Sequence, residues 1–206
     1  MTLPALYAIV DPLDTGANPV TLGEAMLAGG ARLLQLRLKD ASPRDVYAVA
    51  SRLRDLTRAA GALLVVNDRP DVATAVEADA VHLGQDDLPV PAARRIVPPH
   101  VGVGVSTHDP GELEAAIAVL PDYLAVGPVF ETTSKRRALA PRGIELVRLA
   151  RRSWGGPLVA IGGITADTAR AVLEAGADSV AMIGALVRAA DVAEATRAVL
   201  ARLPRP

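Results

Sequence analysis

Short apolar segments rich in β-branched residues recur through the chain, and segments with helical periodicity lie between them. Most of the apolar segments are continuous rather than alternating, which is typical of strands that are covered on both faces. The pattern predicts eight strands, over Leu6–Val10, Leu33–Leu38, Leu63–Val66, Ala80–Leu83, Val101–Val105, Tyr123–Val129, Leu158–Ile161 and Val180–Ile183.

The segment after Ser42 carries the clearest helical pattern. Ser42 suits the N-cap and Pro43 suits the first helical position, and apolar residues then recur along one face. Similar starts predict helices after Asp109, Thr165 and Asp191, the second of which ends near Gly176. Shorter helices are predicted near residues 71–76 and 91–96.

Alternation of strand and helix, repeated eight times in 206 residues, predicts an α/β fold, a single (β/α)8 TIM barrel. The barrel fills residues 1–206 as one catalytic domain, with a loose tail at about 204–206. A doubly wound sheet is the alternative, and it would usually carry a glycine-rich phosphate loop after its first strand. That turn reads Asp11-Pro12-Leu13-Asp14 and contains no glycine.

Composition narrows the classes of function. The 22 Lys and Arg residues nearly balance the 23 Asp and Glu residues, which argues against a general nucleic-acid binder. The absence of cysteine excludes disulfides, thiol nucleophiles and thiolate zinc sites. No apolar run approaches the roughly 20 residues that span a bilayer, and the chain start lacks a basic signal-peptide region. We therefore expect a cytoplasmic protein without nucleic-acid or membrane partners; a homo-oligomer remains open.

Rare polar residues gather where the predicted strands end. The only lysines, Lys39 and Lys135, both lie in such segments, as do both glutamines and Asn67. In a TIM barrel the catalytic groups collect at the carboxyl ends of the strands. Gln35, Arg37 and Lys39 alternate along the second strand, so their side chains share one side and predict a cationic phosphate site at the barrel mouth. A surface ion-pair site is the alternative for this set.

Two carboxylates end neighbouring strands. Asp68 and Asp87 are placed to hold one Mg²⁺ together with substrate phosphates, because Mg²⁺ needs few protein carboxylates. A turn role is the alternative for Asp68, and the adjacent Asp86 leaves the choice within this pair open. His82, inside the fourth strand, is interpreted as a hydrogen-bonded core imidazole.

A second anion site is predicted from the later strand ends. Hydroxyls and an ammonium follow the sixth strand, and glycines follow the seventh and eighth, where barrels of this type bind phosphate through backbone N–H groups. Tight turns that need a positive φ are the alternative for the glycines. The residues are Thr132, Ser134, Lys135, Gly162, Gly163, Ile183 and Gly184.

Two anion sites, one metal site and no evident nucleophile or poised base favour chemistry driven by leaving-group stabilisation. Departure of a diphosphate with Mg²⁺ fits this set of groups.

The chain resembles thiamine-phosphate synthases from Tyr7 to about Leu200. The resemblance rests on motifs that occur in the family's order and spacing: Gln35-x-Arg37-x-Lys39, Val66-Asn67-Asp68, the segment 82–87, Gly104-Val105-Ser106, the segment 122–135 and the segment 161–165. The Gly-Gly-Ile-Thr motif alone is common among phosphate-binding barrels, whereas the first, second and fifth motifs together are specific.

The resemblance implies a Mg²⁺-dependent coupling of 4-amino-2-methyl-5-hydroxymethylpyrimidine diphosphate with 4-methyl-5-(2-hydroxyethyl)thiazole phosphate. C–O cleavage would precede attack by the thiazole nitrogen, and thiamine phosphate and diphosphate would be the products. By motif, Gln35 matches a pyrimidine contact and Ser106 a residue near the pyrimidine and diphosphate. Arg37, Lys39, Asn67 and Lys135 match diphosphate contacts, Asp68 and Asp87 the metal ligands, and Thr132, Ser134, Gly163, Ile183 and Gly184 the thiazole-phosphate site.

The chain departs from the family at Gly184, where many members carry serine. One hydroxyl contact to the thiazole phosphate would then be missing, and backbone N–H groups would serve instead. A thiazole tautomerase of the same superfamily is one alternative function, but Pro128 stands where that enzyme carries its catalytic-site histidine. A non-catalytic barrel that binds thiazole phosphate or thiamine phosphate is another alternative.

Overall fold

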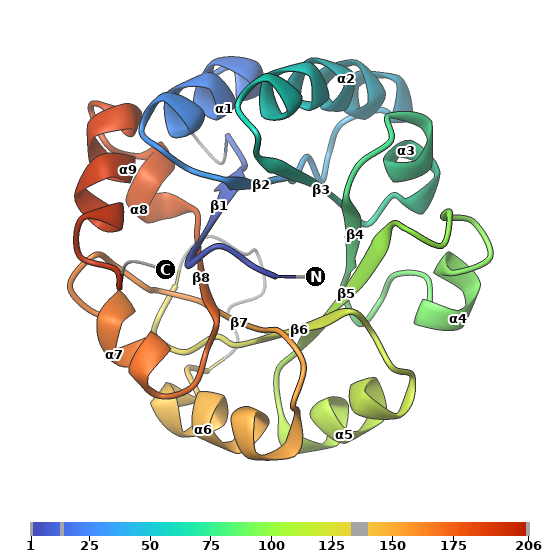
Figure 1. Cartoon of the computed structure of the whole chain (residues 1–206), viewed down its shortest axis with the longest axis vertical. Helices are drawn as coiled ribbons and strands as arrows, with labels where there is room; N and C mark the ends of the chain where they lie inside the picture. Colours follow the sequence, from blue (N-terminus) through green and yellow to red (C-terminus); the bar gives the residue numbers. More distant parts are fainter. Residues whose placement is uncertain (1, 13–14, 133–139, 205–206) are drawn as a thin grey trace.

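Eight parallel strands form a closed barrel in the computed structural model, which describes residues 2–12, 15–132 and 140–204 (Figure 1). Each strand pairs with the next, and β8 pairs with β1, so the predicted TIM barrel is confirmed. The strands are β1 (Leu6–Val10), β2 (Leu33–Leu36), β3 (Leu63–Asn67), β4 (Ala80–Leu83), β5 (Gly102–Thr107), β6 (Tyr123–Val126), β7 (Leu158–Ile161) and β8 (Ser179–Met182).

Three predicted strands extend past the ends that the structure gives them; for β8 the difference is one residue, Met182 instead of Ile183. β2 ends at Leu36 rather than Leu38, although the N–H of Arg37 still donates to the carbonyl of Val10 at 3.0 Å. β6 ends at Val126 rather than Val129 because the chain then follows the end of β7 in irregular geometry. These irregular extensions carry predicted site residues out to the barrel mouth.

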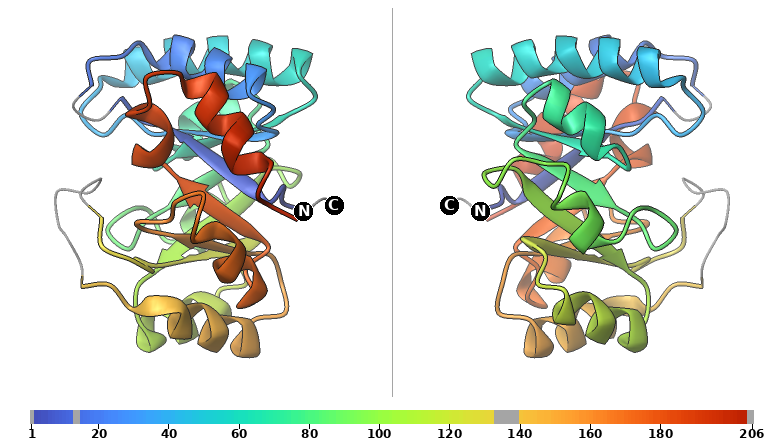
Figure 2. Two further views of the ribbon diagram at one scale, coloured as in Figure 1. Left: turned by 90° about the vertical axis from the view of Figure 1, so that its left-hand side faces the viewer. Right: turned by 90° about the vertical axis from the view of Figure 1, so that its right-hand side faces the viewer.

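Helices surround the barrel and flank its strands in both side views (Figures 1 and 2). They are α1 (Pro19–Ala28), α2 (Pro43–Ala59), α3 (Pro70–Ala75), α4 (Val90–Ala93), α5 (Pro110–Ala118), α6 (Gly143–Ser153), α7 (Ala169–Glu174), α8 (Gly184–Val187) and α9 (Val192–Leu200). None of the helices within the described ranges is long and apolar enough to cross a membrane.

Side-chain caps confirm three of the four predicted helix starts. Ser42, Asp109 and Asp191 each accept a hydrogen bond from the backbone N–H three residues on, at the starts of α2, α5 and α9. The prediction for Thr165 is wrong. Its own N–H donates to the Thr168 hydroxyl at 3.0 Å, so Thr165 opens a turn, and α7 begins only at Ala169.

The barrel interior holds polar groups among its apolar side chains. Tyr7 and Tyr123 are almost completely buried, and Gln35, His82 and Ser106 are buried as well. A Cβ atom on Gly104 would overlap the Tyr123 ring, so only glycine leaves room for that ring. The interior therefore contains a hydrogen-bonding layer beneath the barrel mouth.

An aspartate repeats at the opposite end of the barrel, where the strands begin. Each copy immediately precedes an even-numbered strand and accepts both from a backbone N–H of the preceding strand and from an arginine. Each of the three contacts joins the loop before one strand to the backbone of the preceding strand and to an arginine outside the barrel. The sets are Asp79 with Leu64 and Arg54, Asp122 with Val103 and Arg94, and Asp178 with Leu158 and Arg151.

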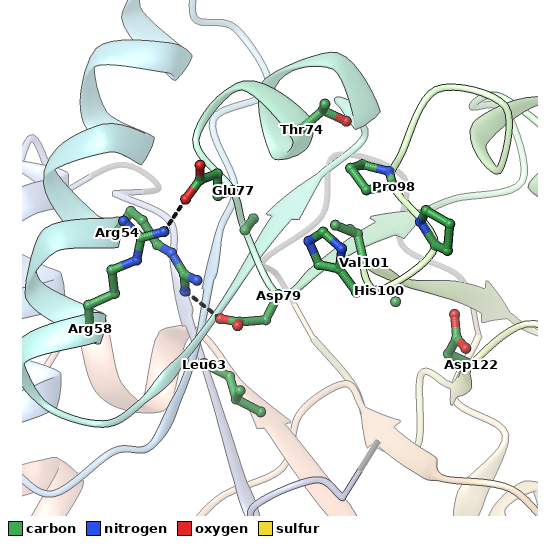
Figure 3. Close-up of a pocket in the computed structure, with 13 residues that line it drawn as sticks. Arg54, Arg58, Leu63, Thr74, Glu77, Asp79, Pro98, His100, Val101 and Asp122 are labelled. Carbon is green, nitrogen blue, oxygen red and sulfur yellow. Dashed lines mark hydrogen bonds and ion pairs between the residues drawn. The ribbon is translucent and has the colours of Figure 1, made fainter.

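A groove of about 860 Å³ lies beside the first two of these aspartates (Figure 3). Arg54 points to Asp79 at 2.6 Å, and Arg58 pairs with Glu77. The groove is thus at the barrel end away from the predicted site residues, and its arginines already have carboxylate partners. We assign these groups to stability rather than to substrate binding.

Replacing Asp79 with alanine should lower the free energy of unfolding by about 2–3 kcal/mol, because the buried Leu64 N–H and Arg54 both lose an acceptor. Urea denaturation measures the change. The control is Asp55→Ala, whose exposed carboxylate lies 3.9 Å from Arg52 and should contribute less than about 0.5 kcal/mol. Equal effects of the two substitutions would refute the assigned role of Asp79.

Candidate active site at the barrel mouth

Arg37 is fixed at the mouth by a carboxylate from the neighbouring strand. It follows β2, and its guanidinium forms an ion pair with Asp11, which follows β1. Both side chains are largely buried, with 15% and 10% of their surface exposed. A charge pair held in this way keeps the guanidinium in one orientation at the barrel mouth.

Lys39 lies further out and pairs with Asp68. Its side chain is 47% exposed, whereas that of Asp68 is 19% exposed, so the ammonium stands at the rim and the carboxylate beneath it. The alternation predicted for the segment after β2 thus brings two cations to one mouth. Each faces a carboxylate from an adjacent strand end.

Asp68 and Asp87 are hydrogen-bonded to each other across the ends of β3 and β4. Asp68 has a φ of 62°, and its N–H donates to the carbonyl of His82 at 2.8 Å. Asp87 is held by the N–H of Gly84, which donates to its carboxylate at 2.7 Å. Asp68 therefore lies in a bend with a positive φ that places its carboxyl beside Asp87, and α3 begins at Pro70 without a side-chain cap.

The two carboxyls have unequal proton affinities. Burial, followed by the hydrogen bond with Asp87, raises the pKa of Asp68 to about 6, although Lys39 opposes the shift. Burial would raise the pKa of Asp87 too, but its hydrogen bonds with Asp68 and the Gly84 N–H outweigh burial and lower that pKa. Asp68 therefore takes up a proton more readily than Asp87 as the pH falls, and a bound cation would favour the ionised form of both.

The donor set fits Mg²⁺ better than a metal that needs an all-protein cage. Among the described residues, no group of three or more His, Cys, Asp or Glu side chains is arranged to hold a metal. Mg²⁺ commonly takes one or two carboxylates and completes its shell with waters and substrate phosphates. Asp86 is exposed, whereas Asp87 contacts Asp68, so Asp87 is the better placed of the two neighbours.

Gln35 and Ser106 line the floor beneath these charges. The Gln35 amide donates to the Tyr7 hydroxyl at 2.8 Å, and the Ser106 hydroxyl lies 2.8 Å from Nε2 of His82. Nδ1 of His82 lies 3.0 Å from the Tyr123 hydroxyl, so both ring nitrogens are hydrogen-bonded, as predicted. Asn67, half-buried, ends β3 immediately before Asp68.

Two glycines shape the opposite side of the mouth. Gly162 and Gly163 have φ values of 105° and 62°, a backbone region that residues with a side chain rarely adopt. A Cβ on Gly163 would overlap the Glu131 carbonyl, so the segment leading to Thr132 packs directly against Gly163. The N–H of Phe130 also donates to the carbonyl of Gly162 at 2.9 Å. The positive-φ alternative for these glycines is correct and is compatible with a phosphate turn.

Gly184 begins the one-turn helix α8, and Ile183 is its N-cap. Backbone N–H groups at such a position have no partner within the helix.

Ser134 and Lys135 lie outside the described residues, so their predicted roles stay predictions. Ion pairs join Arg37 to Asp11 and Lys39 to Asp68, and Asp68 contacts Asp87, so two charged groups lie at the ends of neighbouring strands.

Three residues of this region were not predicted as site residues: Asp11, Tyr7 and Tyr123. Asp11 follows the first strand as directly as Asp68 follows the third, which is a usable signal. Tyrosine is rare in this chain, and two of its 3 copies lie within apolar strands. A buried hydroxyl needs a partner, so both tyrosines indicated polar contacts inside the barrel.

A TIM barrel with cations, paired carboxyls and glycine turns at its mouth defines a class: barrels that act on phosphorylated small molecules. The comparisons with known proteins narrow this class. The family model described as "Thiamine monophosphate synthase" matches residues 6–186, and the chain belongs to this family.

Individual relatives agree over nearly the full chain. A thiamine-phosphate synthase of Chloroflexus aurantiacus is 47% identical over 193 residues, which cover 93% of this chain and 89% of that protein. One of Moorella thermoacetica is 45% identical and covers 93% and 92%. The solved structure of a thiamine phosphate pyrophosphorylase from Pyrococcus furiosus has a TM-score of 0.87 at 39% identity, covering 96% and 94% of the two chains.

Proposed function

We propose that the protein couples 4-amino-2-methyl-5-hydroxymethylpyrimidine diphosphate with 4-methyl-5-(2-hydroxyethyl)thiazole phosphate and releases thiamine phosphate and diphosphate. The observation that carries the proposal is the set of charged strand-end residues, Arg37, Lys39, Asp68 and Asp87, at the mouth of a barrel of this family. Small molecules are its partners, and the cytoplasm is its compartment. Assembly into a homo-oligomer is compatible with this activity.

Asp68 and Asp87 would hold Mg²⁺, and Arg37, Lys39, Asn67 and Lys135 would hold the diphosphate. When bound, Mg²⁺ neutralises negative charge on the diphosphate oxygens. The arginine contributes a fixed bidentate donor, and the lysine at the rim a more mobile charge. The catalytic residues in this proposal are Arg37, Lys39 and Lys135.

The two heterocycles would occupy different sides of the mouth. Gln35 and Ser106, on the floor, suit the pyrimidine because both are buried and polar. The thiazole phosphate would lie against Thr132, Ser134, Gly163, Ile183 and Gly184. With glycine at 184, backbone N–H groups would take the place of a hydroxyl there.

The reaction needs stabilisation of a leaving group more than a base. The C–O bond to the diphosphate breaks, and its electron pair leaves with the diphosphate, where the cations stabilise it. The aminopyrimidine spreads the positive charge left on its methylene carbon. The thiazole nitrogen then forms the new C–N bond with its own lone pair, so no proton has to be removed by the protein.

A coupling assay on the purified chain tests this proposal. Both heterocyclic substrates are supplied with and without Mg²⁺, and thiamine phosphate and diphosphate are followed together. Equal, Mg²⁺-dependent formation of the two products is expected. Folded protein that forms neither product, yet isomerises a carboxylated thiazole phosphate, would instead establish the tautomerase.

A further inference from the structure

A chain of hydrogen bonds crosses the barrel interior and joins Gln35 to Ser106. The Gln35 amide contacts the Tyr7 hydroxyl at 2.8 Å, and that hydroxyl contacts the Tyr123 hydroxyl at 3.0 Å. The Tyr123 hydroxyl lies 3.0 Å from Nδ1 of His82, and Nε2 of His82 lies 2.8 Å from the Ser106 hydroxyl. Five strands, β1, β2, β4, β5 and β6, each contribute one member.

With the Gln35 amide nitrogen directed at the Tyr7 hydroxyl, one direction of the hydrogens satisfies every hydroxyl in this series of contacts. The Gln35 nitrogen has hydrogens and no acceptor site, so the Tyr7 hydroxyl accepts from it and gives its own hydrogen to Tyr123. The Tyr123 hydroxyl then donates to Nδ1 of His82. Neutral His82 therefore carries its hydrogen on Nε2 and donates to Ser106, whose own hydrogen is released for another acceptor.

Burial maintains this order. It raises the pKa of both Tyr7 and Tyr123 above the ordinary value, so each phenol stays protonated and can donate a hydrogen bond to the next residue. The Tyr123 ring stacks on His82 with centroids 5.6 Å apart, and Gly104 leaves the space for it. An unpaired hydroxyl would be costly in this interior, so reversing one bond requires reversing the others.

We propose that this series of five hydrogen-bonded residues, here called the relay, sets which hydrogen-bonding group each of its two ends presents to the substrate. Gln35 presents its carbonyl oxygen as an acceptor, and Ser106 presents its hydroxyl as a donor. Tyr7, Tyr123 and His82 are positioning residues that act through these two ends. The inference rests on the proposed function in placing the pyrimidine against Gln35 and Ser106.

The relay makes the site selective for a ring with an amino group. The 4-amino N–H of the pyrimidine can donate to the Gln35 carbonyl oxygen. The carbonyl oxygen of a 4-oxo pyrimidine would instead face another oxygen. Turning the Gln35 amide would relieve that clash only if every hydrogen of the relay reversed. Because the amino group also stabilises the cation during the reaction, binding rather than rate isolates this contact. A 4-oxo analogue of the pyrimidine diphosphate should bind at least about a hundredfold more weakly than the 4-amino substrate.

The tautomer of His82 tests the relay without any substrate. In nitrogen-detected NMR spectra of the protein, His82 should show a hydrogen-free Nδ1 and a protonated Nε2. His100→Gln and His108→Gln assign the signals, because the chain has 3 histidines. Tyr123→Phe should remove this preference, and Tyr47→Phe, which changes a tyrosine that is 48% exposed on α2, should not. A hydrogen on Nδ1 in the unaltered protein would overturn the proposal.

Kinetics then test whether the relay acts through its ends. Tyr123→Phe should lower kcat/KM for coupling roughly tenfold, the effect of one misdirected hydrogen bond. In a protein that already carries Ser106→Ala, Tyr123→Phe should lower kcat/KM by less than about twofold, because the Ser106 hydroxyl through which Tyr123 acts is absent. Tyr7→Phe should narrow the preference for the 4-amino over the 4-oxo ring.

Additive effects of Tyr123→Phe and Ser106→Ala, or an unchanged ring preference in Tyr7→Phe, would overturn the proposal. If the unaltered protein forms no thiamine phosphate, the proposed function fails. The relay is then judged by the His82 tautomer alone, so the two failures are distinguishable.

Discussion

Replacing Asp68 with alanine is expected to lower kcat/KM for coupling by roughly 10²–10³-fold. The substitution removes one of two neighbouring carboxyls and leaves Lys39 without its partner, so under the proposed function Mg²⁺ would lose half of its protein ligands. Initial rates at several Mg²⁺ concentrations measure the effect. The rates should stay low even at high Mg²⁺.

Asp87 and Asp86 provide a matched comparison for this prediction. Asp87→Ala should behave like Asp68→Ala, because Asp87 contacts Asp68 and is held by Gly84. Asp86→Ala changes an exposed carboxylate next to it and should leave the rates close to those of the unaltered protein. Near-normal activity of Asp68→Ala, or equal losses in Asp86→Ala and Asp87→Ala, would refute the metal assignment.

Replacing Arg37 with glutamine should lower kcat/KM by roughly 10²–10³-fold as well. A largely buried cation is lost, and the Asp11 carboxylate remains at the mouth, where it repels a diphosphate. The KM for the pyrimidine diphosphate should rise, and kcat should fall. Steady-state kinetics with that substrate varied measure both effects.

A double variant separates the loss of the cation from the exposure of Asp11. Asp11→Asn combined with Arg37→Gln should recover part of the lost rate, because the repelling charge is gone. Arg52→Gln is the control, since Arg52 is exposed on α2 and should not affect the kinetics. An Arg37→Gln variant with normal kinetics would show that Arg37 serves only to neutralise Asp11.

Hydrophobic periodicity was sufficient to predict the barrel. Few folds are compatible with continuous apolar strands that alternate with amphipathic helices. The barrel closes with β8 beside β1, as expected. Boundaries were harder to predict. Thr165 and Thr168 are both residue types that can cap a helix, and only the turn in which the Thr165 N–H donates to the Thr168 hydroxyl decides where α7 begins.

The sequence predicted that the charged residues lie near the ends of strands, and the structure places Arg37 and Asp68 directly after β2 and β3. The strand-end position of Arg37, Lys39, Asp68 and Asp87 is visible in the sequence. The partners of these groups were not visible. Pairing of Arg37 with Asp11 depends on β1 lying beside β2, and the bond between Tyr7 and Tyr123 joins residues 116 positions apart. Closure of the barrel creates both contacts.

The central claim is that the mouth of this barrel holds a diphosphate together with Mg²⁺. Calorimetric titration of inorganic diphosphate into the protein, with and without Mg²⁺, tests it most directly. We expect diphosphate to bind at least about tenfold more tightly with Mg²⁺, a difference of about 1.4 kcal/mol. The gain should vanish in Asp68→Ala. An affinity that Mg²⁺ leaves unchanged, or raises equally in Asp68→Ala, would contradict the claim.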